Sequence, residues 1–152
     1  MSEISDNSRQ YTVELLALPA RIAQTRRILG DRLREWSLDP LVDRAALGLT
    51  ELLTNVHRHA RPDKSCTVGV EVRDGRLIVS VSDNDPRLPV LRAADPSALR
   101  TCGRGMALIE AVSESWGARH GAGRAGKVIW FSLRTGDAER AATPAGSRPR
   151  AR

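Results

Sequence analysis

The chain has 152 residues, which fits one ordinary domain that is large enough to bury a core. Apolar residues make up 41% and aromatic residues only 3%, so Leu, Val, Ile and Ala must form that core. The net charge is +6, but half of the excess (+3) lies between Arg134 and Arg152, where five Arg face Asp137 and Glu139. DNA binding therefore ranks last, and no run approaches the roughly 18–20 apolar residues of a membrane span. We expect a disordered leader (1–10), one domain (11–134) and a disordered basic tail (135–152).

The first predicted elements are a strand and two helices. Tyr11 to Leu18 is apolar enough for a strand, which Pro19 ends while opening an amphipathic helix. Its inward side chains recur at helical spacing: Ile22, Thr25, Ile28, Leu29, Leu33 and Trp36. Asp39 before Pro40 is typical of an N-cap, so a second helix is predicted from about Pro40 to Ala60. Its expected buried stripe is Val42, Ala45, Leu49, Leu52 and Val56.

A hairpin and a long loop follow the second helix. Segments 65–73 and 76–82 alternate apolar and polar residues, and Asp74-Gly75 between them is a strong hairpin signal. Residues 83–102, rich in Pro, Asp, Arg and Ala, predict a long loop or lid. The remaining predicted elements are a helix and two strands, at 104–113, 116–120 and 127–133. This order predicts an α/β two-layer sandwich, with a mixed, mostly antiparallel sheet covered by helices on one face.

The second predicted helix carries a carboxylate and an amide that point away from its apolar stripe. Glu51 and Asn55 are four residues apart and so lie one turn apart on one face. Asn55 offers an oxygen ligand to Mg²⁺, and Glu51 is suited to position or deprotonate an attacking hydroxyl or water. Taken alone, the pair fits a solvated polar helix face better than a site.

Two further motifs suit a nucleotide. Asp83 ends a strand where its carboxylate is able to accept the exocyclic amine of a purine, although Asp also simply stops strands. Gly103 and Gly105 precede an apolar helix, so their backbone N–H groups and the helix dipole suit phosphate. Arg100 and Arg104 add charge for phosphate oxygens. Each motif alone has an ordinary structural explanation, and only their order and spacing together favour a nucleotide site.

Together these motifs resemble a known family. Glu51 to Ala60 (ELLTNVHRHA) is similar to the N-box of the GHKL (HATPase) ATPases, the Asp83 turn to their G1 box, and Gly103 to Gly105 to their G2 box. Trp116-Gly117 and Gly126 to Trp130 resemble the bacterial anti-sigma factor serine kinases within that superfamily. The likeness runs from about Leu18 to Leu133 and implies a Bergerat α/β sandwich that binds ATP and Mg²⁺ under a lid.

The resemblance also implies residue roles. Glu51 would be the catalytic base, Asn55 the magnesium ligand and Asp83 the adenine contact. The remaining nucleotide contacts expected are Arg100, Gly103, Arg104, Gly105 and Met106, although Met106 also falls on the inward stripe of its helix with Leu108, Ile109 and Val112. Weaker candidates are Thr54, Arg58 and His59.

One position departs from the family pattern. The fuller G1 pattern has glycine two residues after the aspartate, whereas this chain has Asp85 followed by Pro86. The extra carboxylate either weakens nucleotide binding by like-charge repulsion or faces solvent.

Two functions compete for this sequence. The first is an anti-sigma factor serine/threonine kinase that binds a sigma factor and phosphorylates an anti-anti-sigma protein. The alternative is a non-catalytic switch that uses ATP to tune protein binding, and a sensor histidine kinase catalytic domain is disfavoured. A cytoplasmic location, reduced Cys66 and Cys102 and a homodimer are expected, the last from resemblance only. His57 and His59 diverge by about 200° on a helix, so they are not expected to share a metal.

Overall fold

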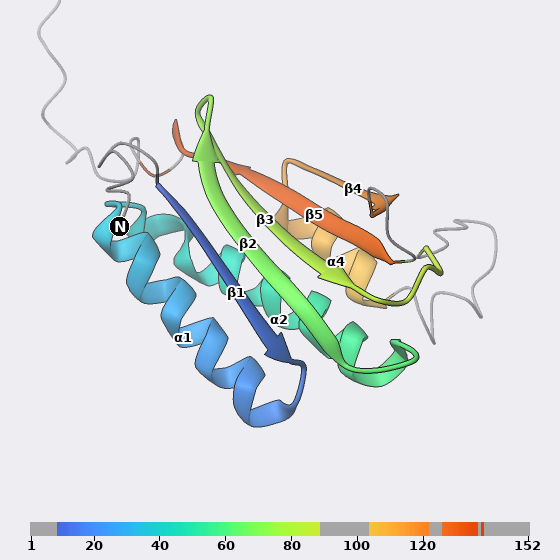
Figure 1. The fold of residues 1–152 in the computed structure, drawn as a ribbon. Coiled ribbons are helices and arrows are strands. Elements are labelled where there is room, and N and C mark those ends of the chain that lie inside the picture. The colour runs from blue at the N-terminus through green and yellow to red at the C-terminus, as the bar shows by residue number, and fades with distance from the viewer. Residues whose placement is uncertain (1–8, 89–103, 122–125, 137, 139–152) are drawn as a thin grey trace, which may run out of the picture.

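The computed structural model describes residues 9–88, 104–121, 126–136 and 138, which form a sheet with helices packed against it (Figure 1). The elements in chain order are β1 (Gln10–Leu16), α1 (Pro19–Glu35), the 3-10 turn η1 (Asp39–Leu41), α2 (Val42–His59), β2 (Ser65–Arg73), β3 (Arg76–Asp83), α4 (Arg104–Val112), β4 (Ser115–His120) and β5 (Lys127–Arg134). The predicted element order and α/β class are therefore confirmed. Most of the predicted leader, of the predicted tail and of the predicted lid lies outside the described residues.

The sheet has five strands in the order β1-β2-β3-β5-β4. Every pairing among these strands is antiparallel, so the expectation of a mixed sheet was wrong. The insertion of β5 between β3 and β4 brings the start of β5 beside the end of β3, where Asp83 is the register partner of Lys127. This pairing joins residues 44 positions apart and positions the site described below.

The helices cover one face of the sheet (Figure 1). Helix α2 lies between α1 and α4 and also packs on β3 and β5, so it is the central helix of its layer. Its buried side is wider than the predicted stripe, because Ala46, Gly48 and Leu53 are buried as well. Side chains that alternate along the strands complete this core, among them Val68, Val79 and Phe131, none of which is exposed.

The hairpin between β2 and β3 forms as the sequence predicts. Asp74 and Gly75 have φ values of 53° and 74°, the left-handed conformations that a two-residue turn of this type requires. Asp and Gly tolerate such values better than other residues do. The local sequence therefore sets both the turn and the register of these two strands.

The start of the second helix differs from the prediction. Asp39 and Pro40 lie in a 3-10 turn, and the α-helix begins only at Val42. No side chain caps either the turn or the helix, so the expected Asp39 N-cap was wrong. Proline supplies the φ angle of a first helical turn of either kind, which explains why the sequence signal does not separate the two.

Gly48 provides a test of how closely α2 approaches the sheet. A Cβ atom at this position would lie 2.6 Å from the ring of Phe131. We expect Gly48→Ala to lower the free energy of unfolding by about 1–3 kcal/mol through overpacking, as measured by urea denaturation. Gly30→Ala in α1 is the matched control, because its Cβ would lie 3.1 Å from the guanidinium at the end of the long Arg34 side chain and 3.5 Å from Val42. That control should instead gain up to about 1 kcal/mol from helix propensity, and equal effects of both changes would contradict the packing argument.

Candidate functional site

Helix α2 carries the two side chains that the sequence singled out first. Glu51 and Asn55 are both partly exposed, whereas Leu52 and Val56 beside them are buried. The helix therefore turns the carboxylate and the amide away from the core, one turn apart on the same side. Thr54 is also partly exposed, and the remaining weak candidates, Arg58 and His59, are exposed at the end of the helix.

The glycine motif is only partly described. Arg104 and Gly105 begin α4, as predicted, but Arg100 and Gly103 lie outside the described residues. Met106, the last of the expected nucleotide contacts, is 1% exposed and belongs to the hydrophobic core. This location supports a packing role for Met106.

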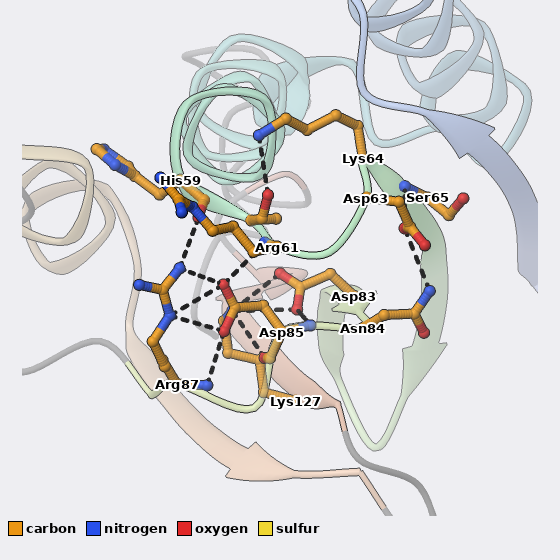
Figure 2. Close-up of polar contacts among 11 residues, drawn as sticks. His59, Arg61, Asp63, Lys64, Ser65, Asp83, Asn84, Asp85, Arg87 and Lys127 are labelled. Carbon is orange, nitrogen blue, oxygen red and sulfur yellow. Dashed lines mark hydrogen bonds and ion pairs between the residues drawn. The ribbon is translucent and has the colours of Figure 1, made fainter.

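Asp83 ends β3 with a buried carboxylate that is already ion-paired (Figure 2). The ammonium of Lys127 lies 3.0 Å from each of its two oxygens and also donates to the carbonyl oxygen of Asp85 at 3.1 Å. The backbone N–H of Asp85 donates to Asp83 Oδ1 at 2.9 Å. Asp83, the expected contact to adenine, is therefore a carboxylate with the cation of Lys127 beside it. Only the fold reveals that cation.

Gly126 allows β5 to approach the end of β3. A Cβ atom on this residue would overlap the carbonyl oxygen of Asp83, so only glycine fits without a backbone shift. Lys127 follows directly and starts β5 opposite Asp83. The close approach thus places the lysine within reach of the carboxylate.

Asp85 occupies the position where the family pattern has glycine, and its side chain points inward. The residue is 3% exposed, which excludes the second of the two alternatives, that it faces solvent. Its carboxylate accepts hydrogen bonds from Arg87 Nη2 at 2.6 Å and from the backbone N–H of Arg61 at 3.0 Å. Arg87 Nη2 also donates to the carbonyl oxygen of His59 at 2.8 Å, which fastens the turn to the end of α2 (Figure 2). Because the positive charge of Arg87 offsets the negative charge of Asp85, the carboxylate repels a nucleotide less strongly.

The hydrogen-bonded ion pair between Arg87 and Asp85, here called the clamp, predicts how the stability of the protein depends on pH. Hydrogen bonding from Arg87 holds the pKa of Asp85 well below its usual range, against the opposing effect of burial. The clamp therefore contributes fully above the unfolded-state pKa of about 4 and loses its contribution as pH falls toward the lower folded-state pKa. We expect Asp85→Asn to cost about 1–3 kcal/mol at pH 7 and to flatten the loss of stability below about pH 5. Urea denaturation between pH 3 and 7 measures both effects.

The control for that series is Asp43→Asn, which neutralises an exposed carboxylate in the first turn of α2. Its free energy of unfolding should fall at acidic pH as steeply as that of the parent protein. An Asp85→Asn curve that runs parallel to the parent curve at every pH would contradict the role of the clamp.

A cavity of about 640 Å³ opens at the end of the sheet that carries Asp83 and Lys127. Its walls come from β1, β2, β3 and β5 and from the flanking Asn84, Gly121 and Gly126, with no contribution from α2. The cavity therefore reaches Asp83 and Lys127 but not Glu51 or Asn55. The structure does not bring all of the predicted site residues to one hollow.

Cys66 also lines this cavity, yet it is a poor nucleophile. Burial, and to a lesser degree the carboxylate of Asp83, raise the pKa of its thiol to about 12. The thiol consequently stays protonated at neutral pH and behaves as a packing group. Cys66 is a free thiol, as the sequence predicts, and Cys102 lies outside the described residues.

Sequence reasoning missed Lys127 and Arg87. Lys127 continues the inward alternation of Ile129, Phe131 and Leu133, and a lysine on an apolar strand face needs an acidic partner. The alternation was therefore enough to predict that Lys127 is buried. It did not indicate which acidic residue pairs with this lysine. Arg87 gave no comparable signal, because an arginine two residues from an aspartate is ordinary in a loop.

The described part of the chain holds neither a cluster of metal ligands nor a membrane-spanning helix. No group of three or more His, Cys, Asp or Glu side chains there is able to hold a metal ion. The side chain of Asn55 carries one oxygen of the kind that Mg²⁺ accepts as a ligand. Among the described helices, none is long and apolar enough to cross a membrane.

An open antiparallel sheet with helices on one face, a carboxylate and an amide on the central helix, and a buried aspartate at a strand end define a GHKL-type two-layer sandwich. Residues 15–133 match the family model described as the histidine kinase-like ATPase domain. The chain belongs to this family, and membership implies ATP binding. It is also similar to an uncharacterized protein of Streptomyces coelicolor, with 37% identity over 70 residues that cover 45% of this chain and 67% of that protein.

Proposed function

We propose that this protein is an ATP-dependent anti-sigma factor serine/threonine kinase, which binds a sigma factor and phosphorylates an anti-anti-sigma protein. The observation that carries the proposal is the shared direction of Glu51 and Asn55, off the core side of α2. Phosphoryl transfer needs a metal ligand and a group that takes a proton from the attacking hydroxyl, and these two side chains are able to supply them. Resemblance supplies the identity of the two protein partners and the expectation of a homodimer.

The other expected site residues also have roles in this proposal, except Met106, which lies in the core. Asn55 holds magnesium through its side-chain oxygen, and Glu51 accepts the proton of a serine or threonine hydroxyl on the bound protein. Asp83 accepts the exocyclic amine of adenine, while Gly103 and Gly105, with Arg100 and Arg104, take the phosphates. Magnesium, when bound, neutralises charge on the phosphates.

A non-catalytic switch is the second candidate, and a specific observation favours it. The cavity at Asp83 and Lys127 has no wall from α2, so a ligand held there is not placed against Glu51. In this version, ATP stabilises the domain and tunes capture of a protein without being consumed. It predicts a rise in melting temperature with ATP but neither phosphate release nor transfer.

Calorimetric titration of ATP with and without Mg²⁺ tests the nucleotide site. We expect the parent protein to bind ATP more tightly with Mg²⁺, and Asn55→Ala to lose most of that difference because the metal has lost its protein ligand. Gln24→Ala is the matched control, since it removes an exposed amide from α1. Binding that ignores both magnesium and Asn55→Ala would remove Asn55 from the site, and no binding at all would refute the function.

A further inference from the structure

The Asp83–Lys127 ion pair has a consequence for base recognition. Asp83 presents two carboxylate oxygens, and the ammonium of Lys127 lies 3.0 Å from both. Both residues are nearly buried, with 8% and 9% of their surfaces exposed, yet both line the cavity at the strand ends. A nucleobase that reaches Asp83 therefore also meets Lys127.

Elementary hydrogen bonding restricts which base fits such a pair. An amine that donates to Asp83 must come close to the ammonium, which is also a donor and carries a positive charge. The two donors compete unless the base also offers an acceptor beside its amine. Adenine does, because ring nitrogens N1 and N7 flank its exocyclic amine.

We propose that Lys127 is a base-reading residue, which donates a hydrogen bond to a ring nitrogen of adenine while Asp83 accepts from the adjacent amine. The inference rests on the proposed nucleotide function and extends it by naming a specificity residue. The contact network supports a fixed ammonium, since Lys127 Nζ is held by Asp83 and by the carbonyl oxygen of Asp85 at 3.1 Å. An ammonium that is held in place loses little freedom when it binds a base.

The chemistry of the pair also predicts what it rejects. Hypoxanthine has a carbonyl oxygen where adenine has its amine, so an inosine nucleotide sets an acceptor against the carboxylate of Asp83. A site built on hydrogen bonds discriminates strongly against such a mismatch, because buried polar groups are left unpaired. The proposed order of affinity is therefore ATP above ITP.

Nucleotide analogues test the proposal on the unaltered protein. Isothermal titration would compare ATP with ITP, 1-deaza-ATP and 7-deaza-ATP, each deaza analogue replacing one ring nitrogen by C–H and keeping the amine. We expect ITP and one of the deaza analogues to bind about 10-fold more weakly than ATP. ITP loses the amine that donates to the carboxylate of Asp83, and the deaza analogue loses the ring nitrogen that accepts from the ammonium of Lys127. The analogue that binds weakly identifies the nitrogen that Lys127 contacts.

A variant then assigns the loss to Lys127. In Lys127→Met, ATP and the discriminating deaza analogue should bind with equal affinity, because the donor has gone. If that variant does not fold, the analogue series on the parent protein still tests whether a ring nitrogen of adenine is contacted, which the inference requires. Equal binding of ATP and both deaza analogues by the parent protein overturns the inference but leaves the proposed function intact.

Two other results are informative. Tighter ATP binding by Lys127→Met would show that the lysine competes with the amine for Asp83, and would overturn the inference. Failure of ATP itself to bind the parent protein would refute the proposed function, and the inference with it.

Discussion

Lys127→Met is expected to lower the free energy of unfolding by about 3–5 kcal/mol, which is large beside the roughly 5–15 kcal/mol of a typical domain. Asp83 would keep its buried negative charge but lose the cation 3.0 Å away. The carbonyl oxygen of Asp85 would lose its contact with the same ammonium. Urea denaturation at pH 7 gives the loss directly, and a cool temperature keeps a weakened variant folded.

The double variant Asp83→Asn/Lys127→Met shows how much of the lost stability comes from the unpaired charge of Asp83 and how much from altered packing. Removing both charges leaves no uncompensated ion, so most of the stability should return. Lys64→Met provides a matched control, because it also removes a lysine that donates to a backbone carbonyl, but from a half-buried position without an acidic partner in the same contact. A double variant no more stable than Lys127→Met alone would contradict the charge argument.

Glu51→Ala is expected to slow phosphate transfer to the anti-anti-sigma protein by about 10²–10⁴-fold, the usual contribution of a general base. The affinity for ATP should change little, because the proposed role of Glu51 is to take a proton from the substrate hydroxyl. Single-turnover transfer of a labelled γ-phosphate measures the rate, and calorimetry measures binding of ATP on the same sample.

Glu35→Ala is the control for this second experiment, since it removes an exposed glutamate from the end of α1. It should transfer phosphate at the parent rate. Undiminished transfer by Glu51→Ala would remove Glu51 from catalysis. ATP binding by a parent protein that shows no transfer would favour the binding switch.

Local patterns predicted most of the fold. Asp74-Gly75 predicted the hairpin correctly, because a two-residue turn fixes the register of the strands that it joins. In the structure, β2 covers the predicted residues and β3 is one residue longer than predicted. The apolar spacing on α1 and α2 predicted helices that pack on one side, since the helical period alone decides which residues share a face. The Asp39-Pro40 signal failed at finer scale, because a 3-10 turn and an α-helix begin alike.

The site could be predicted only in part. Glu51 and Asn55 were recognisable because their geometry depends on one helix, and the structure keeps them off the core side. The burial of Asp85 could not be predicted, because its partners, Arg87 and the N–H of Arg61, meet it only after α2 and β3 have packed. Burial of a carboxylate depends on such partners, which spacing along the chain does not reveal.

Local sequence patterns were enough to predict the order of elements, the hairpin, the apolar faces and the positions of Glu51, Asn55 and Asp83. Each depends on a period, a turn or a motif within a short stretch of chain. The position of β5 beside β3, which brings Lys127 to Asp83 across 44 residues, depends on the folding of the whole sheet. Strand order is set by packing of the whole sheet against its helices, so the charge beside the expected adenine contact became visible only in the folded protein.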